Sequence, residues 1–547
     1  WEYAGIEEVF SLIAACLAAA VAKIVIILFT WSVMPRSWYV LDTIYLMILI
    51  GATRVSYRLI RLRRQNRTFP WSKRKKVMII GGGEAGRSLI TEIQNSKYLD
   101  QKVVCIIDDD PYKIGRYIKG VKVVGNRNSI KKSVKKYNVQ QIILTIPSAN
   151  AAKIRPIVEI CQDTNCELMI LPGVYQLVNG EVKASKLRPV NIDDLLGRDE
   201  VHVNLNEVMD YVSGRVIMVT GGGGSIGSEL CRQIAKHSPK QLIIFDIYEN
   251  NAYDIQQELL REQPKLDLVV LIGSVRDENR INSIFEQYRP EIIYHAAAHK
   301  HVPLMEGSPN EAIKNNVLGT YNMVRMADKW NAKRFVQIST DKAVNPTNIM
   351  GASKRICEMI IQTYNKESNT EYVAVRFGNV LGSNGSVIPL FKKQIAEGGP
   401  VTVTHPEIIR YFMTIPEAVS LVLQAGAYAK GGEIFVLDMG EPVKILDLAR
   451  NMIRLSGYKV DQDIKIEFTG LRPGEKLYEE LLMDEEGMTD TPNKLIHIGH
   501  PIDVDEVKLA HALRVLESAA QNETDDMRLI VESIVPTYHP KLNKSTQ

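Results

Sequence analysis

A glycine-rich turn between a strand-like run and a helix-like stretch has the composition of a pyrophosphate-binding loop. Glycines recur at intervals of three after the apolar run Val216–Val219 and before a helical stretch that begins at Ser228. Glycine lets the chain turn tightly and approach a ligand closely, and the N-terminus of the next helix presents unpaired N–H groups to phosphate oxygens. The residues that we expect to bind a dinucleotide cofactor here are Gly221, Gly224, Ser225, Ile226 and Gly227.

Asp246 closes the next strand-like run, LIIFD, at about the spacing where an acidic group accepts hydrogen bonds from the adenosine ribose. No lysine or arginine occurs in residues 247–254, and Glu249 adds a second acidic side chain. The extra 2′-phosphate of NADP would therefore meet negative charge without a counter-charge. The sequence predicts NAD as the cofactor and disfavours NADP.

The consecutive residues Thr340, Asp341 and Lys342 follow the strand-like run FVQIS and offer an acid and a base side by side. Taken alone, so short a motif is more often a polar strand end with a solvated lysine. Here it lies between the glycine-rich loop and Lys354, and this combination favours a catalytic role.

Two successive α/β series are expected to position these groups, because strand-like apolar runs alternate twice with helical stretches. Residues 74–186 are predicted to form one Rossmann-like domain, and residues 215–503 a second one that contains the chemistry above. Residues 187–214 read as a connector, and residues 504–547 as a polar helical tail. The predicted fold is thus α/β with two Rossmann-like domains in tandem.

The first of these domains has its own glycine-rich turn, with Gly81, Gly83 and Gly86 after the run VMII. Asp108 and the next two aspartates end a later strand-like run before Pro111. This pattern repeats the logic of a nucleotide-binding loop, but crowded carboxylates before proline also begin ordinary turns. Nucleotide binding and a purely structural role both remain open here.

The N-terminal part, residues 1–62, is predicted to form transmembrane helices. The stretches Val9–Trp31 and Trp38–Ile60 are each about long enough to cross a bilayer, although Lys23 and Asp42 weaken the pattern. A buried helical hairpin is the alternative. A basic run follows the second stretch and would keep the rest of the chain cytoplasmic. Because the chain opens with Trp1, further N-terminal segments are expected to be missing.

Composition excludes several broad classes. The 547 residues suggest two or three folded units, and 45% hydrophobic with 24% charged residues is typical of a mainly globular chain. With 67 basic and 63 acidic side chains, the net charge of +4 provides no general case for nucleic-acid binding. The six cysteines lack the spacing of a metal site or a disulfide framework. We expect neither nucleic acid nor metal as a partner.

Six segments of the second domain form a recognisable set: TGGGGSIGSEL (220–230), YHAAAHKHVPLME (294–306), NNVLGT (315–320), STDKAVNPTNIMGASKR (339–355), RFGNVLGSNGSVIPLF (376–391) and RPGEKLYEEL (472–481). These segments resemble those of extended short-chain dehydrogenase/reductases. More narrowly, they are similar to the long, membrane-bound UDP-N-acetylglucosamine 4,6-dehydratases of bacterial polysaccharide and glycoprotein biosynthesis.

That resemblance implies an NAD-dependent enzyme that acts on a UDP-N-acetylhexosamine, specifically UDP-N-acetylglucosamine, and releases a 4-keto-6-deoxy sugar nucleotide. It also implies a small C-terminal substrate portion, assembly into homo-oligomers and a multi-pass anchor in the bacterial cytoplasmic membrane, with membrane lipid around the N-terminal helices and the catalytic domains in the cytoplasm. The glycan pathway is not implied.

The same resemblance suggests roles for the catalytic residues. Asp341 would protonate the leaving C6 hydroxyl, Lys342 would remove the C5 proton, and Thr340 would bind near the C4 oxygen. Lys354 falls four residues after Met350, where the wider superfamily has Tyr-xxx-Lys. Methionine cannot accept a proton, so Thr340, Asp341 or water must receive the C4 hydroxyl proton. The long dehydratases share this methionine.

Other positions are assigned to binding by the same comparison of motifs. The cofactor would be lined by Ser274, Val275, Ala296, Ala297, Lys300, Asn316 and Lys354. Lys300 would also approach the substrate, whose diphosphate and uridine would be held by Asn379, Ser386, Arg410, Arg472 and Glu475. For each arginine, a surface salt bridge is an equally good interpretation.

Three other functions deserve comparison with the dehydratase. A UDP-N-acetylhexosamine 4-epimerase would share the fold and cofactor, but Met350 and the Asp341-Lys342 pair count against it. A non-catalytic nucleotide-binding membrane regulator would not need Asp341 or Lys354, and both are present. A membrane-bound sugar-phosphate transferase is excluded by the segments from TGGGGSIG to RPGEKL.

Overall fold

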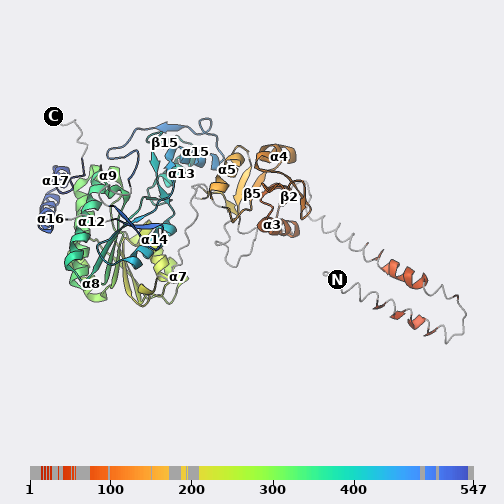
Figure 1. The fold of residues 1–547 in the computed structure, drawn as a ribbon, viewed down its shortest axis with the longest axis horizontal. Helices are drawn as coiled ribbons and strands as arrows, with labels where there is room; N and C mark the ends of the chain where they lie inside the picture. Colours follow the sequence, from red (N-terminus) through yellow and green to blue (C-terminus); the bar gives the residue numbers. More distant parts are fainter. Residues whose placement is uncertain are drawn as a thin grey trace. The chain divides into compact units, whose positions relative to one another are not determined.

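The computed structural model describes residues 74–96, 99–149, 151–164, 166–171, 187–191, 194, 209–480, 487–499 and 504–539, with scattered positions between 14 and 56. Each of the two predicted Rossmann-like regions contains its own β-sheet, with helices between the strands in the sequence (Figure 1). The α/β class expected from the alternating apolar runs is confirmed.

Within the described residues, the second region forms a nine-stranded sheet in the order β10-β9-β8-β11-β12-β13-β18-β22-β21. The strands from β10 to β18 pair in parallel, and β22 and β21 extend the edge in antiparallel pairing. This is the doubly wound order, with a topological switch between β8 and β11 where such sheets bind ligands. The strands are β8 (Val216–Thr220), β9 (Gln241–Asp246), β10 (Leu268–Ile272), β11 (Ile292–His295), β12 (Arg334–Ile338), β13 (Glu371–Arg376), β18 (Ile434–Leu437), β21 (Met488–Asp490) and β22 (Ile496–Gly499).

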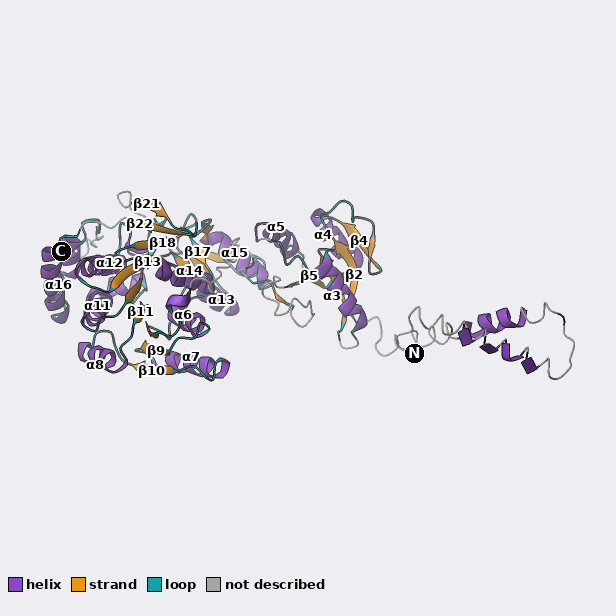
Figure 2. Cartoon of the chain, turned by 60° about the horizontal axis from the view of Figure 1, so that its bottom comes forward, coloured by secondary structure: helices purple, strands orange, loops and turns teal. Residues whose placement is uncertain are grey.

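Hydrophobic cores cover both faces of this sheet, because alternate strand residues point to opposite sides. In β8, Met218 enters one core, while Ile217 and Val219 enter the other. Helices α8, α11 and α12 contribute to the first core, and α6, α7 and α14 to the second (Figure 2). The helices of these layers are α6 (Ser225–Ala235), α7 (Glu249–Glu262), α8 (Glu278–Tyr288), α9 (Val302–Gly307), α10 (Pro309–Ala312), η9 (Ile313–Leu318), α11 (Gly319–Lys329), α12 (Ile349–Glu367) and α14 (Ile415–Tyr428).

A smaller C-terminal portion is built from short strand pairs and two helices. Phe391, Leu448 and Ile453 are buried in its apolar interior. Its strands pair as β14 with β17, β15 with β20, and β16 with β19. Its elements are β14 (Asn379–Val380), α13 (Val387–Ala396), β15 (Val401–Val403), β16 (Ile409–Arg410), β17 (Phe412–Met413), β19 (Val443–Lys444), α15 (Ile445–Leu455) and β20 (Ile466–Phe468).

The predicted helical tail is part of the packed second domain. Helices α16 (Glu506–Gln521) and α17 (Met527–Ile534) place Leu513, Leu516 and Val531 in the same core as α12. Each fully buried aliphatic side chain of this size stabilises the fold by roughly 1.5–3 kcal/mol. The periodic leucines of α16 could have indicated this packing from the sequence.

The first region forms its own sheet in the order β3-β4-β2-β1-β5-β6-β7. Strand β7 (Arg188–Pro189) lies in the predicted connector, yet it pairs antiparallel with β6 and so extends this sheet. The other elements are β1 (Lys75–Ile80), α3 (Glu84–Asn95), β2 (Gln101–Ile107), β3 (Tyr117–Ile118), β4 (Val121–Gly125), α4 (Ile130–Tyr137), β5 (Gln141–Leu144), α5 (Ala151–Gln162) and β6 (Glu167–Ile170).

The two predicted membrane spans, Val9–Trp31 and Trp38–Ile60, lie largely outside the described residues. Residues 41–50 are helical, and Lys23 Nζ lies 2.5 Å from Asp42 Oδ2, so the charges that interrupt the two stretches pair with each other. Among the residues that the structure describes, no helix combines the length and apolarity needed to cross a bilayer. The membrane anchor stays a prediction from the sequence.

Candidate active site

The loop between β8 and α6 forms a tight cradle of glycines. Gly221 has a φ angle of +67°, a left-handed conformation that favours glycine. A Cβ atom on Gly227 would overlap the carbonyl oxygen of Gly221, so the first turn of α6 packs directly on the loop backbone. Gly224 precedes α6 and has no side chain to cap the helix. The N–H groups of Ser225 and Ile226 therefore lie at a helix N-terminus suited to an anion.

Asp246 ends β9 and organises this loop. Its Oδ2 atom accepts the N–H of Gly223 at 2.8 Å, and its Oδ1 atom accepts the N–H of Tyr248 at 2.8 Å. The carboxylate is therefore held in one orientation, and each oxygen keeps a lone pair for a ribose hydroxyl. This is the position at which a dinucleotide fold places its ribose acceptor.

The segment after β11 lies against the same loop. The N–H of Ala296 donates to the carbonyl oxygen of Thr220 at 3.1 Å. A Cβ atom on Gly221 would lie only 2.8 Å from the backbone nitrogen of Ala297. The structure thus brings both alanines next to the glycine cradle at the topological switch. This is the place where the sequence analysis predicts the cofactor.

The remaining cofactor residues lie at neighbouring strand ends. After β10, Ser274 Oγ accepts the N–H of Arg276 at 3.2 Å, and Val275 is buried. Lys300 is exposed in the segment that follows β11. None of these contacts requires a cofactor, so the assignment of Ser274, Val275 and Lys300 to cofactor binding stays a prediction.

Asn316 ties the segment after β11 to helix α12. Its Oδ1 atom accepts the N–H of His299 at 2.8 Å, and its Nδ2 atom donates to Ser353 Oγ at 2.9 Å. Met350 and Lys354 lie one turn apart on α12 and are 4% and 6% exposed. The fully formed amide contacts make Asn316 a positioning group for the helix that bears Lys354.

Thr340, Asp341 and Lys342 turn back on one another at the carboxyl end of β12. Thr340 Oγ1 and Lys342 Nζ both donate to Asp341 Oδ1, each at 2.9 Å. The other carboxylate oxygen, Asp341 Oδ2, is buried and has no hydrogen-bond partner within the described chain. A Cβ atom on Gly378 would lie 3.0 Å from it. A buried, unsatisfied carboxylate oxygen is costly and is often explained by function.

The pKa values of the two lysines of the site are shifted in opposite directions. Burial lowers the pKa of Lys342, but the negative charges of Asp341 and Glu479 outweigh this effect, and the net pKa is raised. Lys342 is thus held as an ammonium in the absence of substrate. Burial lowers the pKa of Lys354, and its neighbours Cys357 and Glu358 oppose this only in part.

A buried ionic network adjoins the turn formed by Thr340, Asp341 and Lys342. Glu358 Oε1 accepts from Ser339 Oγ at 2.6 Å and from Arg376 Nε at 2.8 Å. Its Oε2 atom accepts from Arg376 Nη2 at 2.7 Å and from Arg355 Nη1 at 3.0 Å. Because Ser339 directly precedes Thr340, this network fixes the end of β12 relative to α12.

Two of the predicted substrate residues lie near the Thr340–Lys342 turn and near the glycine cradle. Lys342 Nζ lies 3.4 Å from Asn379 Oδ1. Ser386 precedes α13, and its Oγ atom is buried without a hydrogen-bond partner in the described part of the chain. Nearby, the N–H of Asn384 donates to Ser225 Oγ at 3.2 Å. The start of α13 therefore lies beside the loop expected to bind the cofactor.

The guanidinium of Arg410 binds the segment that contains the RPGEKL motif. It donates to the carbonyl oxygens of Lys476 at 2.8 Å and of Leu477 at 3.2 Å, and it lies 3.6 Å from Glu475. Arg472 is exposed and lies 3.1 Å from the same Glu475. Arg410 therefore holds the RPGEKL segment in place, because its donors point at that segment's backbone. Its contact with a uridine phosphate stays a prediction.

Sequence reasoning missed two groups of this site. Glu479 lies 3.7 Å from Lys342 Nζ and 3.6 Å from Arg410 Nη2, with only 4% of its side chain exposed. The segment RPGEKLYEEL contains several glutamates, and nothing in their order indicates which one faces the lysine. The Glu358–Arg376 pair was also missed, although buried charges in helix and strand runs are an available signal.

The histidines near the cradle serve packing and polar contacts. His295 is fully buried, and its ring lies 2.7 Å from Thr220 Oγ1 and 3.1 Å from Thr320 Oγ1. Burial and the charge of Lys354 lower the pKa of His295 to about 3, so its ring is neutral. His299 lies 3.0 Å from Arg276 Nη2.

The first domain repeats one detail of the second. The N–H of Gly82 donates to Asp108 Oδ2 at 2.7 Å, just as that of Gly223 donates to Asp246. Here, however, Lys113 Nζ also lies 3.1 Å from Asp108 Oδ2. The likeness is local and leaves both predictions for this loop open, nucleotide binding and a structural turn.

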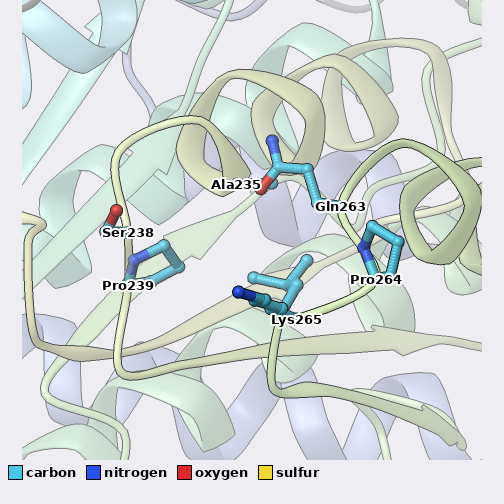
Figure 3. A pocket seen from close by; sticks show the side chains of 7 residues that line it. Ala235, Ser238, Pro239, Gln263, Pro264 and Lys265 are labelled. Atoms are coloured by element: carbon cyan, nitrogen blue, oxygen red, sulfur yellow. The ribbon is translucent and has the colours of Figure 1, made fainter.

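A separate pocket lies at the opposite end of the second sheet (Figure 3). Its lining comes from the end of α6 and from the segments that lead into β9 and β10, with Pro239, Gln263 and Lys265 among its residues. Parallel sheets bind ligands at the carboxyl ends of their strands, whereas this pocket lies at the amino ends. It contains no acid–base pair and is not the candidate site.

Together, the strand order, the glycine cradle, Asp246 and the buried Lys354 define the second domain as an extended short-chain dehydrogenase/reductase. A Cβ atom on Gly221 or Gly227 would collide with backbone atoms of the cradle, and Lys354 is a buried lysine with no hydrogen-bond or ion-pair partner among the described side chains. Both features fit a bound dinucleotide.

The chain belongs to the polysaccharide biosynthesis protein family, whose sequence profile matches residues 217–501. The profile of a CoA-binding domain matches residues 3–172. The family predicted from the six sequence segments is thereby confirmed.

Individual relatives of the chain support its assignment to this family. The chain is 47% identical to the capsular polysaccharide biosynthesis protein CapD of Staphylococcus aureus, covering 89% of this chain and 81% of that protein. It is 44% identical to the probable polysaccharide biosynthesis protein EpsC of Bacillus subtilis, covering 92% and 84%. Among solved structures, Pen from Bacillus thuringiensis is 34% identical over 53% of this chain and 90% of that one, with a TM-score of 0.50.

Proposed function

We propose that this protein is an NAD-dependent UDP-N-acetylglucosamine 4,6-dehydratase that supplies a 4-keto-6-deoxy sugar nucleotide for a surface polysaccharide. The observation that carries the proposal is the buried turn in which Asp341 Oδ1 accepts from Lys342 while Asp341 Oδ2 stays unpartnered. An acid and a base at one centre are what an elimination across C5 and C6 requires.

The roles of the side chains follow from their chemistry. Lys342 removes the C5 proton, which is acidic beside a C4 ketone, and Asp341 protonates the C6 hydroxyl as it leaves as water. Thr340 binds near the C4 oxygen. NAD, which the glycine cradle and Asp246 would hold, would supply the transfer of a hydride from C4 to C6. Met350 cannot take part in proton transfer. Of the acceptors left open by the sequence, we assign the C4 hydroxyl proton to Asp341, which receives it directly or through Thr340.

The cofactor assignment is supported by three groups of this chain. The cradle around Gly227 has no space for a side chain, Asp246 offers acceptors to a ribose, and Lys354 brings a buried positive charge. No basic residue occurs in 247–254 to receive a 2′-phosphate. These features favour NAD over NADP.

A 4-epimerase is the nearest competing enzyme. It would rotate a 4-keto intermediate and return the hydride to C4, and it has no need for a second acid at C6. The Asp341-Lys342 pair and Met350 therefore favour dehydration.

Proton NMR of the reaction tests the proposal. The full chain, loaded with NAD, is mixed with UDP-N-acetylglucosamine, and a new C6 methyl doublet is expected. Release of UDP-N-acetylgalactosamine with no methyl signal would identify an epimerase and contradict the proposal. UDP-glucose is the matched control, and its weaker conversion would support selection for the acetamido group.

A further inference from the structure

Glu479 is a buried carboxyl group that faces the base of the proposed reaction. Its Oε1 atom lies 3.7 Å from Lys342 Nζ and 3.6 Å from Arg410 Nη2. The side chains of Glu479, Lys342 and Asp341 are 4%, 16% and 0% exposed. Two carboxyl groups thus share one ammonium in a nearly dry site, where charge interactions are stronger than in water.

The segment that bears Glu479 is anchored by hydrogen bonds from Thr347, Asn348 and Arg410. The carbonyl oxygen of Gly474 accepts from Thr347 Oγ1 at 2.9 Å and from Asn348 Nδ2 at 3.1 Å, just before α12. Arg410 binds the carbonyl oxygens that follow Gly474. The position of Glu479 next to Lys342 is therefore held by contacts that do not involve the carboxyl group itself.

The proposed reaction has an unmet requirement at Lys342. A lysine can remove the C5 proton only as a neutral amine, but the resting turn holds Lys342 as an ammonium between two carboxyl groups. Asp341 cannot accept the excess proton, since it must take up the C4 hydroxyl proton and deliver it to the leaving group. Another acceptor has to lie within reach of Lys342.

We propose that Glu479 is this acceptor, a positioning residue that acts through Lys342 and stores its proton during each turnover. The inference rests on the proposed dehydratase function and deepens it. Transfer from Lys342 Nζ to Glu479 Oε1 needs a small closure from 3.7 Å to hydrogen-bond distance, or one bridging water.

The protons balance over the cycle. Before elimination, Asp341 gains the C4 hydroxyl proton, and Lys342 passes its proton to Glu479. In elimination, Lys342 takes the C5 proton and Asp341 gives its proton to the C6 hydroxyl, which leaves as water. Lys342 then returns a proton to C5, and Glu479 gives its stored proton back to Lys342. The net change is the loss of one water from the sugar.

The surroundings of Glu479 suit a reversible proton store. Burial raises the pKa of its carboxyl group; Lys342, Arg410 and Lys476 lower it and Asp341 raises it, and the net pKa is raised. A carboxyl group of this kind takes up a proton more readily than one in solvent. Glu480, by contrast, is 52% exposed and lies 3.1 Å from Lys476 Nζ.

The test compares Glu479→Gln with Glu480→Gln in the NAD-loaded full chain. Turnover, deuterium uptake at C5 in heavy water and affinity for UDP-N-acetylglucosamine are measured between pH 6 and 10. We expect Glu479→Gln to bind substrate within about twofold of wild type and to lose at least about tenfold in kcat near neutral pH. This is less than the loss of about a hundredfold expected for a group that reacts with the sugar directly, because solvent can also take up the proton of Lys342.

The pH profile separates proton storage from a structural role. Without Glu479, Lys342 must release its proton to solvent, so the kcat and C5 exchange of Glu479→Gln should rise with pH toward that of wild type. Glu480→Gln should match wild type throughout. A Glu479→Gln enzyme with wild-type turnover, or one with a uniform loss at every pH, would overturn the inference.

Two further results separate a failure of this inference from a folding defect and from a failure of the proposed function. If Glu479→Gln does not fold, Glu479→Asp decides: its shorter carboxyl group should slow C5 exchange without weakening substrate binding, and an unchanged exchange rate would contradict the inference. If wild type and Glu480→Gln form no C6 methyl product, the proposed dehydratase function itself fails. Methyl product from wild type together with an unaffected Glu479→Gln refutes only the role of Glu479.

Discussion

Lys342 Nζ lies 2.9 Å from Asp341 Oδ1, so two consecutive side chains form a hydrogen-bonded ion pair at the carboxyl end of β12. Neighbouring residues in an extended strand point to opposite faces and could not meet in this way. The short helical turn Asp341–Ala343 makes the contact possible, because it bends the chain directly after the strand. The proposed acid and base are therefore available to one face of a substrate.

Replacing the proposed acid should stop dehydration and spare binding. In Asp341→Asn, the amide cannot donate the proton that the departing hydroxyl needs, and we expect kcat to fall at least about a hundredfold. Calorimetric titration should show that the affinities for NAD and UDP-N-acetylglucosamine stay within about threefold of wild type. Wild-type turnover in Asp341→Asn would show that another group supplies the proton.

A product analysis in heavy water tests the same pair from the substrate side. Deuterium should enter at C5, because Lys342 exchanges its proton with solvent, while the hydrogen at C6 should come from C4 of the same sugar. NMR of the product from substrate labelled at C4 checks both positions. Solvent deuterium at C6 would contradict the assigned roles.

Gly227→Ala should weaken nucleotide binding, because the new methyl group would overlap the carbonyl oxygen of Gly221. Shifting the loop should cost about 1–3 kcal/mol, as for other overpacked sites. We expect at least about a tenfold higher Kd for NAD by calorimetry, since each factor of ten corresponds to about 1.4 kcal/mol. Gly307→Ala is the control, because no atom lies within 4 Å of its added Cβ, and its Kd should match that of wild type.

Breaking the buried Glu358–Arg376 pair should destabilise the fold. In Arg376→Leu, the Glu358 carboxylate loses its bidentate partner, and the free energy of unfolding should fall by about 3–5 kcal/mol in urea denaturation. Lys393→Ala removes an exposed pair with Glu397, whose side chains are 73% and 61% exposed, and should change it by less than about 1 kcal/mol. Equal losses in the two variants would contradict a structural role for the buried pair.

Stability should depend on pH through His295. Its pKa is lowered from 6.5 to about 3, mainly by burial, so below pH 6.5 the unfolded chain takes up a proton that the folded chain does not. The free energy of unfolding should therefore fall as pH drops, by about 2 kcal/mol from this group between pH 7 and 5. His295→Gln should remove that part of the pH dependence. An unchanged pH dependence in urea denaturation of the variant would show that His295 does not contribute.

Local sequence patterns determined a large share of this protein. Alternating apolar runs predicted two α/β domains, because strands buried on both faces need continuous apolar residues. The glycine spacing, Asp246 and the Thr340-Asp341-Lys342 motif were found at the ends of β8, β9 and β12. Since the carboxyl ends of parallel strands meet at one edge, these motifs could be assigned to one site from their order alone.

Tertiary structure decided the contacts between segments that are distant in the chain. The sequence motifs assigned Arg410 to a phosphate, and only the fold shows that its guanidinium also binds the backbone after Gly474. Glu479 could not be told apart from Glu475 and Glu480, because only the docking of this segment on α12 brings one of the three glutamates to Lys342. The local sequence pattern determines on which face, or at which end, of a strand or helix a side chain lies. Packing between distant segments determines which of these side chains contact one another.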